Sequence, residues 1–103
     1  MLKVVKFGGS SLSDATQVKK VFNIVTSDPS RKFVVVSAPG KRNSSDTKVT
    51  DMLIKLAEKA LAYEDVTHQL NLILQRFQDI TTGLGMSDDI INVILQDLVS
   101  RLN

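Results

Sequence analysis

The chain has 103 residues, of which 43% are hydrophobic and 23% charged, values typical of one small globular domain. Its formal net charge of +2 is too small to indicate a nucleic-acid partner, and no basic run with interleaved aromatic residues occurs. The absence of cysteine excludes disulfides and thiolate metal sites and is compatible with a reducing, cytoplasmic location. No signal-peptide pattern and no apolar run of about 18 residues occurs, so no membrane partner is expected.

The first predicted strand, Leu2 to Phe7, has a β-branched centre and is followed by two glycines and two serines. This pattern predicts a buried strand, a tight glycine turn and a helix that begins near Ser13. A helix N-terminus attracts anions, because its first N–H groups are unpaired and its dipole is positive there. Gly8 and Gly9 can take positive φ and allow close approach of an oxyanion, and Lys6 adds a positive charge. We interpret the stretch as a phosphate-binding loop, although a plain strand-to-helix turn has the same spacing.

An amphipathic helix is predicted next, with Ser13 as its N-cap and Asp14 in its first turn. It ends near Ser27, before an Asp-Pro pair. Phe33 to Ser37 then forms a second continuous apolar strand. Two such strands joined by one helix predict a right-handed βαβ unit with parallel strands, each buried on both faces.

The rest of the chain predicts a polar loop and three helices. Ala38-Pro39-Gly40 ends the second strand, and the loop over 41–46 either lines a ligand site or merely connects two elements, with Lys41 and Arg42 as solvated residues. The first of these helices begins near Thr47, the second covers about 66–82, and the third runs from Ser87 to the end of the chain. They carry apolar stripes that include Val49, Met52, Leu53, Leu56, Ala60, Val66, Leu70, Ile73, Leu74, Phe77, Ile91, Ile94, Leu95, Leu98 and Leu102.

Candidate metal ligands are sparse in these helices. His68 has no carboxylate or cysteine at ligand spacing, so we expect no metal or catalytic role for it. Asp88 and Asp89 follow Ser87, the expected N-cap of the last helix, and complement the dipole of that helix rather than predict a metal pair. Gly83 and Gly85 are expected to end the preceding helix.

Three motifs together resemble the amino-acid kinase family, and its aspartokinase branch in particular. They are Lys6-Phe7-Gly8-Gly9-Ser10-Ser11, then Val34-Val35-Val36-Ser37-Ala38-Pro39-Gly40, then Lys48-Val49-Thr50-Asp51-Met52-Leu53. The resemblance covers roughly the first half of the chain in the family's order. It implies an α/β fold in which residues 1–103 form a single partial domain, the N-terminal part of a three-layer catalytic domain with a parallel βαβ unit followed by three helices.

The resemblance also implies a reaction, the transfer of the γ-phosphoryl group of ATP, with Mg²⁺, to the β-carboxylate of L-aspartate. Lys6 is similar to the lysine that stabilises the transferring phosphoryl group. Gly8, Gly9 and Ser10 are similar to the backbone and hydroxyl donors to the nucleotide phosphates. The family places this reaction in the biosynthesis of lysine, threonine and methionine.

Two further residues resemble substrate-binding positions. Ser37 matches a serine beside the reaction centre, and Thr50 resembles the threonine that contacts the amino-acid substrate. Without the resemblance, Ser37 is equally typical of a strand-end cap and Thr50 of hydrogen bonding at a helix N-terminus. Asp51 stands where the family has a small polar residue, so its role is open, and no residue is expected to bind a metal directly.

The count of two strands predicts an incomplete sheet, because sheets usually carry more strands. We therefore expect an N-terminal fragment that is inactive by itself and whose exposed faces are covered by another copy, as in a homo-oligomer. Two alternatives stay open. One is another member of the superfamily, of the glutamate or carbamate kinase type, and the other is a non-catalytic helical interaction module in which the glycine loop is only a turn.

Overall fold

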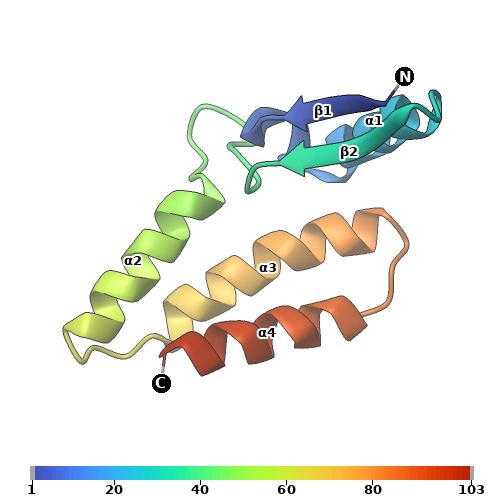
Figure 1. Cartoon of the computed structure of the whole chain (residues 1–103). Coiled ribbons are helices and arrows are strands. Elements are labelled where there is room, and N and C mark those ends of the chain that lie inside the picture. Colours follow the sequence, from blue (N-terminus) through green and yellow to red (C-terminus); the bar gives the residue numbers. More distant parts are fainter. Residues whose placement is uncertain (1, 103) are drawn as a thin grey trace.

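The structure is a computed structural model that describes residues 2–102. Within these residues, two strands, one 3₁₀ helix and four α-helices follow one another. In order they are β1 (Lys3–Phe7), η1 (Gly9–Leu12), α1 (Ala15–Thr26), β2 (Arg31–Val36), α2 (Val49–Leu61), α3 (Thr67–Gly83) and α4 (Asp89–Leu102). This order confirms the predicted α/β chain, a βαβ unit followed by three helices (Figure 1).

The sheet is formed by β1 and β2, which pair in parallel with Val4 opposite Phe33 and Phe7 opposite Val36. Helix α1 lies behind the sheet in the view of Figure 1, and α3 lies between the other helices, in contact with α1, α2 and α4. The prediction that both strands are buried on two faces is wrong for this chain, because Val4 is 69% and Phe33 55% exposed. Among residues 2–102, α1 packs against β2, but successive residues of β2 from Phe33 to Val36 remain exposed, so neither face of this strand is fully covered.

The N-terminus of α1 differs from the prediction by one residue. Asp14, not Ser13, is the N-cap, and its carboxylate accepts a hydrogen bond of 2.9 Å from the Gln17 N–H. A carboxylate also complements the positive end of the helix dipole. Ser13 is buried between η1 and α1, and its hydroxyl donates to the Ser10 carbonyl at 3.1 Å. The glycine turn therefore leads into a 3₁₀ turn before the α-helix begins.

The strand β2 and the helix α2 are also shifted from their predicted starts. Strand β2 begins at Arg31, before the predicted apolar run, and ends at Val36, although the Ser37 N–H still donates to the Phe7 carbonyl at 3.1 Å. Helix α2 begins at Val49 with Lys48 as its N-cap, rather than near Thr47. The Thr47 carbonyl accepts a hydrogen bond from a side chain of α3, which fixes this residue outside the helix.

The ends of α2 and α3 share one hydrogen-bonding pattern. After α3, Gly85 has a φ of 72°, and the Met86 N–H donates to the Thr81 carbonyl at 2.9 Å, which is the Schellman motif. After α2, Tyr63 occupies the equivalent position with a φ of 57°. The expected end of α3 near Gly83 and Gly85 is confirmed, and of these two glycines Gly85 takes the left-handed conformation. Ser87 precedes α4, and its hydroxyl donates to the Asp89 carboxylate at 3.2 Å.

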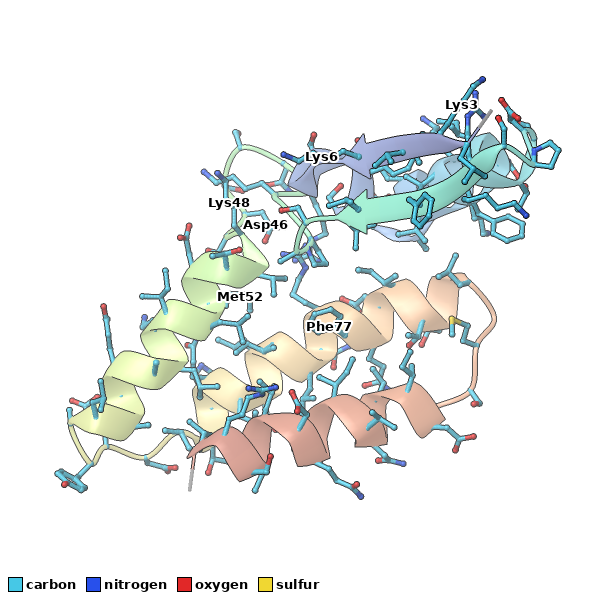
Figure 2. The ribbon with its side chains drawn as sticks, in the orientation of Figure 1. Lys3, Lys6, Asp46, Lys48, Met52 and Phe77 are labelled. Atoms are coloured by element: carbon cyan, nitrogen blue, oxygen red, sulfur yellow. The ribbon has the colours of Figure 1, made fainter. Side chains whose placement is uncertain are left out.

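The core lies between α2 and α3, where Figure 2 shows Met52 on the face of α2 directed toward α3. Val49, Met52, Leu56 and Ile73 form its buried cluster, all from the predicted stripes, and Met52 is a core residue as expected. Partly buried residues of α3 and α4, such as Phe77 and Leu98, pack against this cluster. His68 is exposed on α3. Within the described residues, none of the helices is sufficiently long and apolar to cross a bilayer.

Candidate functional site

A cavity of about 490 Å³ lies where both strands end and α2 begins. Ligands of open parallel α/β sheets bind at this place, beyond the carboxyl ends of the strands. The loop after β1, the loop after β2 and the first turn of α2 supply the lining residues. They are Gly9, Ser10, Ser37, Ala38, Pro39, Gly40, Lys41, Lys48, Thr50 and Asp51.

The first wall of the cavity is made by two glycine-containing loops in backbone contact. The Gly40 N–H donates to the Gly9 carbonyl at 2.8 Å. A Cβ atom on Gly40 would lie 2.7 Å from the carbonyl carbon of Gly9, and one on Gly9 would lie 3.0 Å from the Ala38 oxygen. Neither Gly8 nor Gly9 has positive φ, although glycine at these positions could take it. Gly9 and Gly40 are needed because the two loops approach closely. The sequence placed Gly40 at the end of a strand and within a family motif, but gave it no role in the site.

The second wall is the N-terminus of α2. The Val49 N–H donates to the Pro39 carbonyl at 3.0 Å, which ties the start of α2 to the loop after β2. Thr50 and Asp51 lie in the first turn of the helix and face the same cavity as Ser37. The tertiary structure therefore brings together four of the six predicted site residues, Gly9, Ser10, Ser37 and Thr50.

The other two predicted residues, Lys6 and Gly8, do not line this cavity. Lys6 is exposed at the end of β1, opposite Val35 in the sheet, and Figure 2 shows it near the loop that leads to Lys48. Gly8 is the N-cap of η1, in an extended conformation with a φ of −77°. Both residues shortly precede Gly9, which lines the cavity, in the sequence.

Two lysines of the cavity were missed as site residues. Lys41 was interpreted as a solvated loop residue, and Lys48 was part of a recognised motif without a role of its own. The available signal was their position, directly after the end of a strand and directly before the start of a helix. With Asp51 as the carboxylate among the lining residues, the side chains of the wall carry a net positive charge, which suits an anionic ligand.

Beside the cavity, Arg42 and Asp46 form an ion pair within the loop that joins β2 to α2. Arg42 Nε lies 2.7 Å from Asp46 Oδ2, and the Arg42 N–H donates to the same oxygen at 3.0 Å. The Arg42 guanidinium is the main cause that holds the pKa of Asp46 well below its usual range, and the same pair raises the pKa of Arg42. The carboxylate is therefore ionised at neutral pH and closes the loop on itself.

Metal ligands are not clustered in this region. Within residues 2–102, no group of three or more histidine, cysteine, aspartate or glutamate side chains is placed to hold a metal ion. The cations that the described structure offers at the cavity are lysine side chains.

The structure is an α/β chain with a strand-turn-helix and a cationic cavity where the strands end, and the comparisons specify the class of protein. The sequence profile described as the Amino acid kinase family matches residues 1–103, so the chain belongs to this family. It is 50% identical to Aspartokinase 3 of Bacillus subtilis over 98% of its own length and 22% of that protein. It is 42% identical to the bifunctional aspartokinase/homoserine dehydrogenase 1 of Zea mays over 63% of its own length and 6% of that protein.

A solved structure agrees with this relationship. The crystal structure of Clostridium acetobutylicum aspartate kinase superposes with a TM-score of 0.83 at 38% identity, covering 92% of this chain and 23% of that one. The predicted resemblance to aspartokinase and the predicted fold class are thereby confirmed. The chain spans about a fifth of the length of Aspartokinase 3 and of the clostridial kinase.

Proposed function

We propose that this chain supplies the phosphate-binding loop and part of the amino-acid site of an aspartokinase. The reaction is the transfer of the γ-phosphoryl group of ATP to the β-carboxylate of L-aspartate, which gives aspartyl phosphate. The observation that carries the proposal is the convergence of Gly9, Ser10, Ser37 and Thr50 on one cationic cavity, in a chain 50% identical to Aspartokinase 3.

The role of each residue follows the family resemblance, and Gly9 and Ser10 also line the cavity. Phosphoryl transfer depends on positioning and on neutralisation of charge, so donors and cations matter more than nucleophiles. We assign the backbone of Gly8 and Gly9 and the hydroxyl of Ser10 to the nucleotide phosphates. Lys6, whose exposed side chain is free to turn toward the loop, stabilises the transferring group.

The amino-acid substrate is assigned to the opposite wall. Thr50, in the first turn of α2, contacts aspartate, and Ser37 lies beside the carboxylate that is phosphorylated. The positive end of the α2 dipole and Lys48 favour a carboxylate at this position. Both assignments rest on the family resemblance together with the shared cavity.

The nucleotide brings Mg²⁺ in this proposal. Proteins commonly hold this ion through one or two carboxylates together with substrate phosphates, rather than through a complete set of protein ligands. Asp51 is the carboxylate among the lining residues of the cavity, which fits such a site. When bound, the ion would neutralise charge on the phosphates.

The test is aspartyl phosphate formation by the full-length protein, trapped with hydroxylamine, for the parent, Lys6→Ala and Lys3→Ala. We expect Lys6→Ala to lower kcat by roughly 10²- to 10³-fold, as for other groups that stabilise a transition-state charge. Lys3 is the matched control, because it lies on the same strand and pairs with Asp28 at 2.8 Å, away from the cavity. Equal activities of the two variants would contradict the role of Lys6.

The same assay separates the alternative substrates. Activity with L-glutamate or carbamate in place of L-aspartate would assign the protein to another branch of the superfamily. A full-length protein that consumes no ATP with any of the three would instead favour a non-catalytic interaction module.

We propose that residues 1–103 alone are inactive. We also propose that the protein lies in the cytoplasm, takes part in amino-acid biosynthesis and associates as a homo-oligomer. The exposed apolar residues of β1 and β2, such as Val4 and Phe33, support association. Release of ADP that depends on both ATP and aspartate would contradict the inactivity. A monodisperse monomer in light scattering at high concentration would contradict the oligomer.

A further inference from the structure

Arg76, in the middle of α3, is a buried arginine with an unusual set of partners. It is 4% exposed, whereas arginine is rarely buried unless its charge is paired. Its Nη1 donates to the Thr47 carbonyl at 2.9 Å, and its Nη2 donates to the carbonyls of Gly40 at 2.8 Å and Ser13 at 3.1 Å. One guanidinium thus holds three separate segments of the chain, namely the η1–α1 junction, the loop after β2 and the residue before the N-cap of α2.

All three acceptors are connected to the walls of the candidate site. Gly40 lines the cavity, and Thr47 directly precedes Lys48, which also lines it. Ser13 is connected through its hydroxyl, which donates at 3.1 Å to the carbonyl of Ser10, another lining residue. The hydrogen bonds of Arg76 therefore reach both the wall formed by the two glycine-containing loops and the wall formed by the start of α2. Arg76 itself is not among the residues that line the cavity.

The charge of Arg76 is compensated beside the same loop. Its Nη1 lies 3.3 Å from Asp46 Oδ2, the carboxylate oxygen that also accepts from Arg42. Burial lowers the pKa of Arg76, opposed by Asp46, but a guanidinium remains protonated in proteins. Carbonyl acceptors and a carboxylate offset the desolvation of a buried cation, and they do so only in one geometry.

We infer that Arg76 is a positioning residue of the candidate site, which fixes the loop 37–48 and the η1–α1 junction so that Ser10, Ser37 and Thr50 face one cavity. This inference rests on the proposed function for its kinetic consequences. The geometry does not depend on that function, since it consists of the hydrogen bonds of Arg76 to three backbone carbonyls.

A lysine could not perform this role. The guanidinium is planar and places Nη1 and Nη2 at fixed separation, so two atoms serve three carbonyls at once. An ammonium group keeps the charge near Asp46 but donates from a single point. Arg76→Lys therefore separates the geometry of the fork from the charge.

The first measurement is hydrogen exchange of the full-length protein, parent against Arg76→Lys. We expect faster exchange in segments 8–13 and 38–49, which contain the bonds from Gly40 N–H to Gly9 and from Val49 N–H to Pro39. Exchange in α4 should stay unchanged. The matched control is Arg101→Lys, at an exposed arginine of α4 that pairs with Asp97 at 3.0 Å. Unchanged exchange in both segments, or an equal increase in α4, would overturn the inference.

The second measurement compares the kinetic constants of the full-length parent with those of Arg76→Lys. Two of the three carbonyls, Gly40 and Thr47, belong to the segment between Ser37 and Thr50, so the KM for aspartate should rise more than the KM for ATP. We expect kcat/KM for aspartate to fall about 10- to 100-fold, the scale of a small misplacement of substrate. Unchanged KM values for both substrates with a lower kcat would show only a loss of active protein and would also overturn it. A parent that forms no aspartyl phosphate would refute the proposed function, while the exchange result would still decide the role of Arg76.

Discussion

Helices α2 and α3 and the two strands of this chain bury their apolar residues to very different extents. Val49 and Ile73, at the interface of α2 and α3, are 0% exposed. Every residue of β1 and β2 keeps part of its surface exposed, including the run of three valines that ends β2. The apolar stripes of α2 and α3 are buried against each other, whereas the described residues of α1 and α4 include none that is buried. A strand of this apolar type needs a covering layer on each face. Apolar composition alone therefore does not determine burial.

The largest expected effect is a cavity in the helical core. Ile73→Ala should lower the free energy of unfolding by about 2–5 kcal/mol, because buried methyl and methylene groups leave a void that the neighbouring helices fill only partly. Val35→Ala is the comparison in the sheet, and we expect a loss below about 1 kcal/mol at this exposed position. Urea unfolding of both variants checks the comparison, and equal losses would refute it.

The contact between the two glycine loops at the end of the sheet is expected to be the next most sensitive feature. Gly40→Ala places a Cβ atom 2.7 Å from the Gly9 backbone and should lower stability by about 1–3 kcal/mol. Gly8→Ala serves as control, because a Cβ atom there meets no heavy atom within 4 Å. Thermal unfolding of the pair measures the difference, and a Gly40→Ala variant as stable as Gly8→Ala would show that the loops do not need this close approach.

A smaller effect is expected at the two left-handed helix ends. Tyr63 has a φ of 57° and is 98% exposed, so Tyr63→Gly should raise stability by about 0.5–1 kcal/mol, since glycine tolerates this conformation and little packing is lost. Gly85→Ala, at a φ of 72°, should lower it by about 1 kcal/mol. Opposite signs in denaturant unfolding are required, and a change of the same sign at both positions would contradict the explanation.

The last prediction concerns acid, where the junction between strands and helices depends on the charge of Asp46. The folded-state pKa of Asp46 lies below its unfolded value, mainly because of the Arg42 hydrogen bond, so the carboxylate stabilises the fold above the unfolded pKa. This stability is constant near neutral pH and is lost as the pH falls below about 5. Urea unfolding between neutral and acidic pH should give a shallower decline for Asp46→Asn than for the parent. Parallel profiles would show that Asp46 does not contribute.

Local patterns predicted most of the elements and failed where a distant group intervenes. The stripe of α2 predicted Val49, Met52 and Leu56 as core, since a period of 3.6 residues depends on near neighbours alone. The start of the same helix was placed near Thr47, but the hydrogen bond from Arg76, 29 residues later in sequence, holds that residue outside the helix. Element types were thus easier to predict than their ends.

The candidate site divides in the same way. The motifs around Gly9, Ser37 and Thr50 identified three stretches and their family, because each motif is contiguous in sequence. The cavity that unites them, and the lysines at 41 and 48 that line it, depend on how the two loops and α2 meet. The spacing of residues along the chain does not predict how these three segments contact one another.

The order of helices and strands, the parallel βαβ unit and the family could all be predicted from the amino-acid sequence, since they follow from periodicity and from contiguous motifs. The contact between Gly9 and Gly40, the exposure of the strands in this chain and the hydrogen bonds of Arg76 to both walls of the site became evident from the folded structure. These contacts join residues that are far apart in the sequence, so a local pattern does not reveal them. Arg76 and its Ser13 acceptor are 63 residues apart in sequence, and their hydrogen bond depends on α3 packing beside the start of α1.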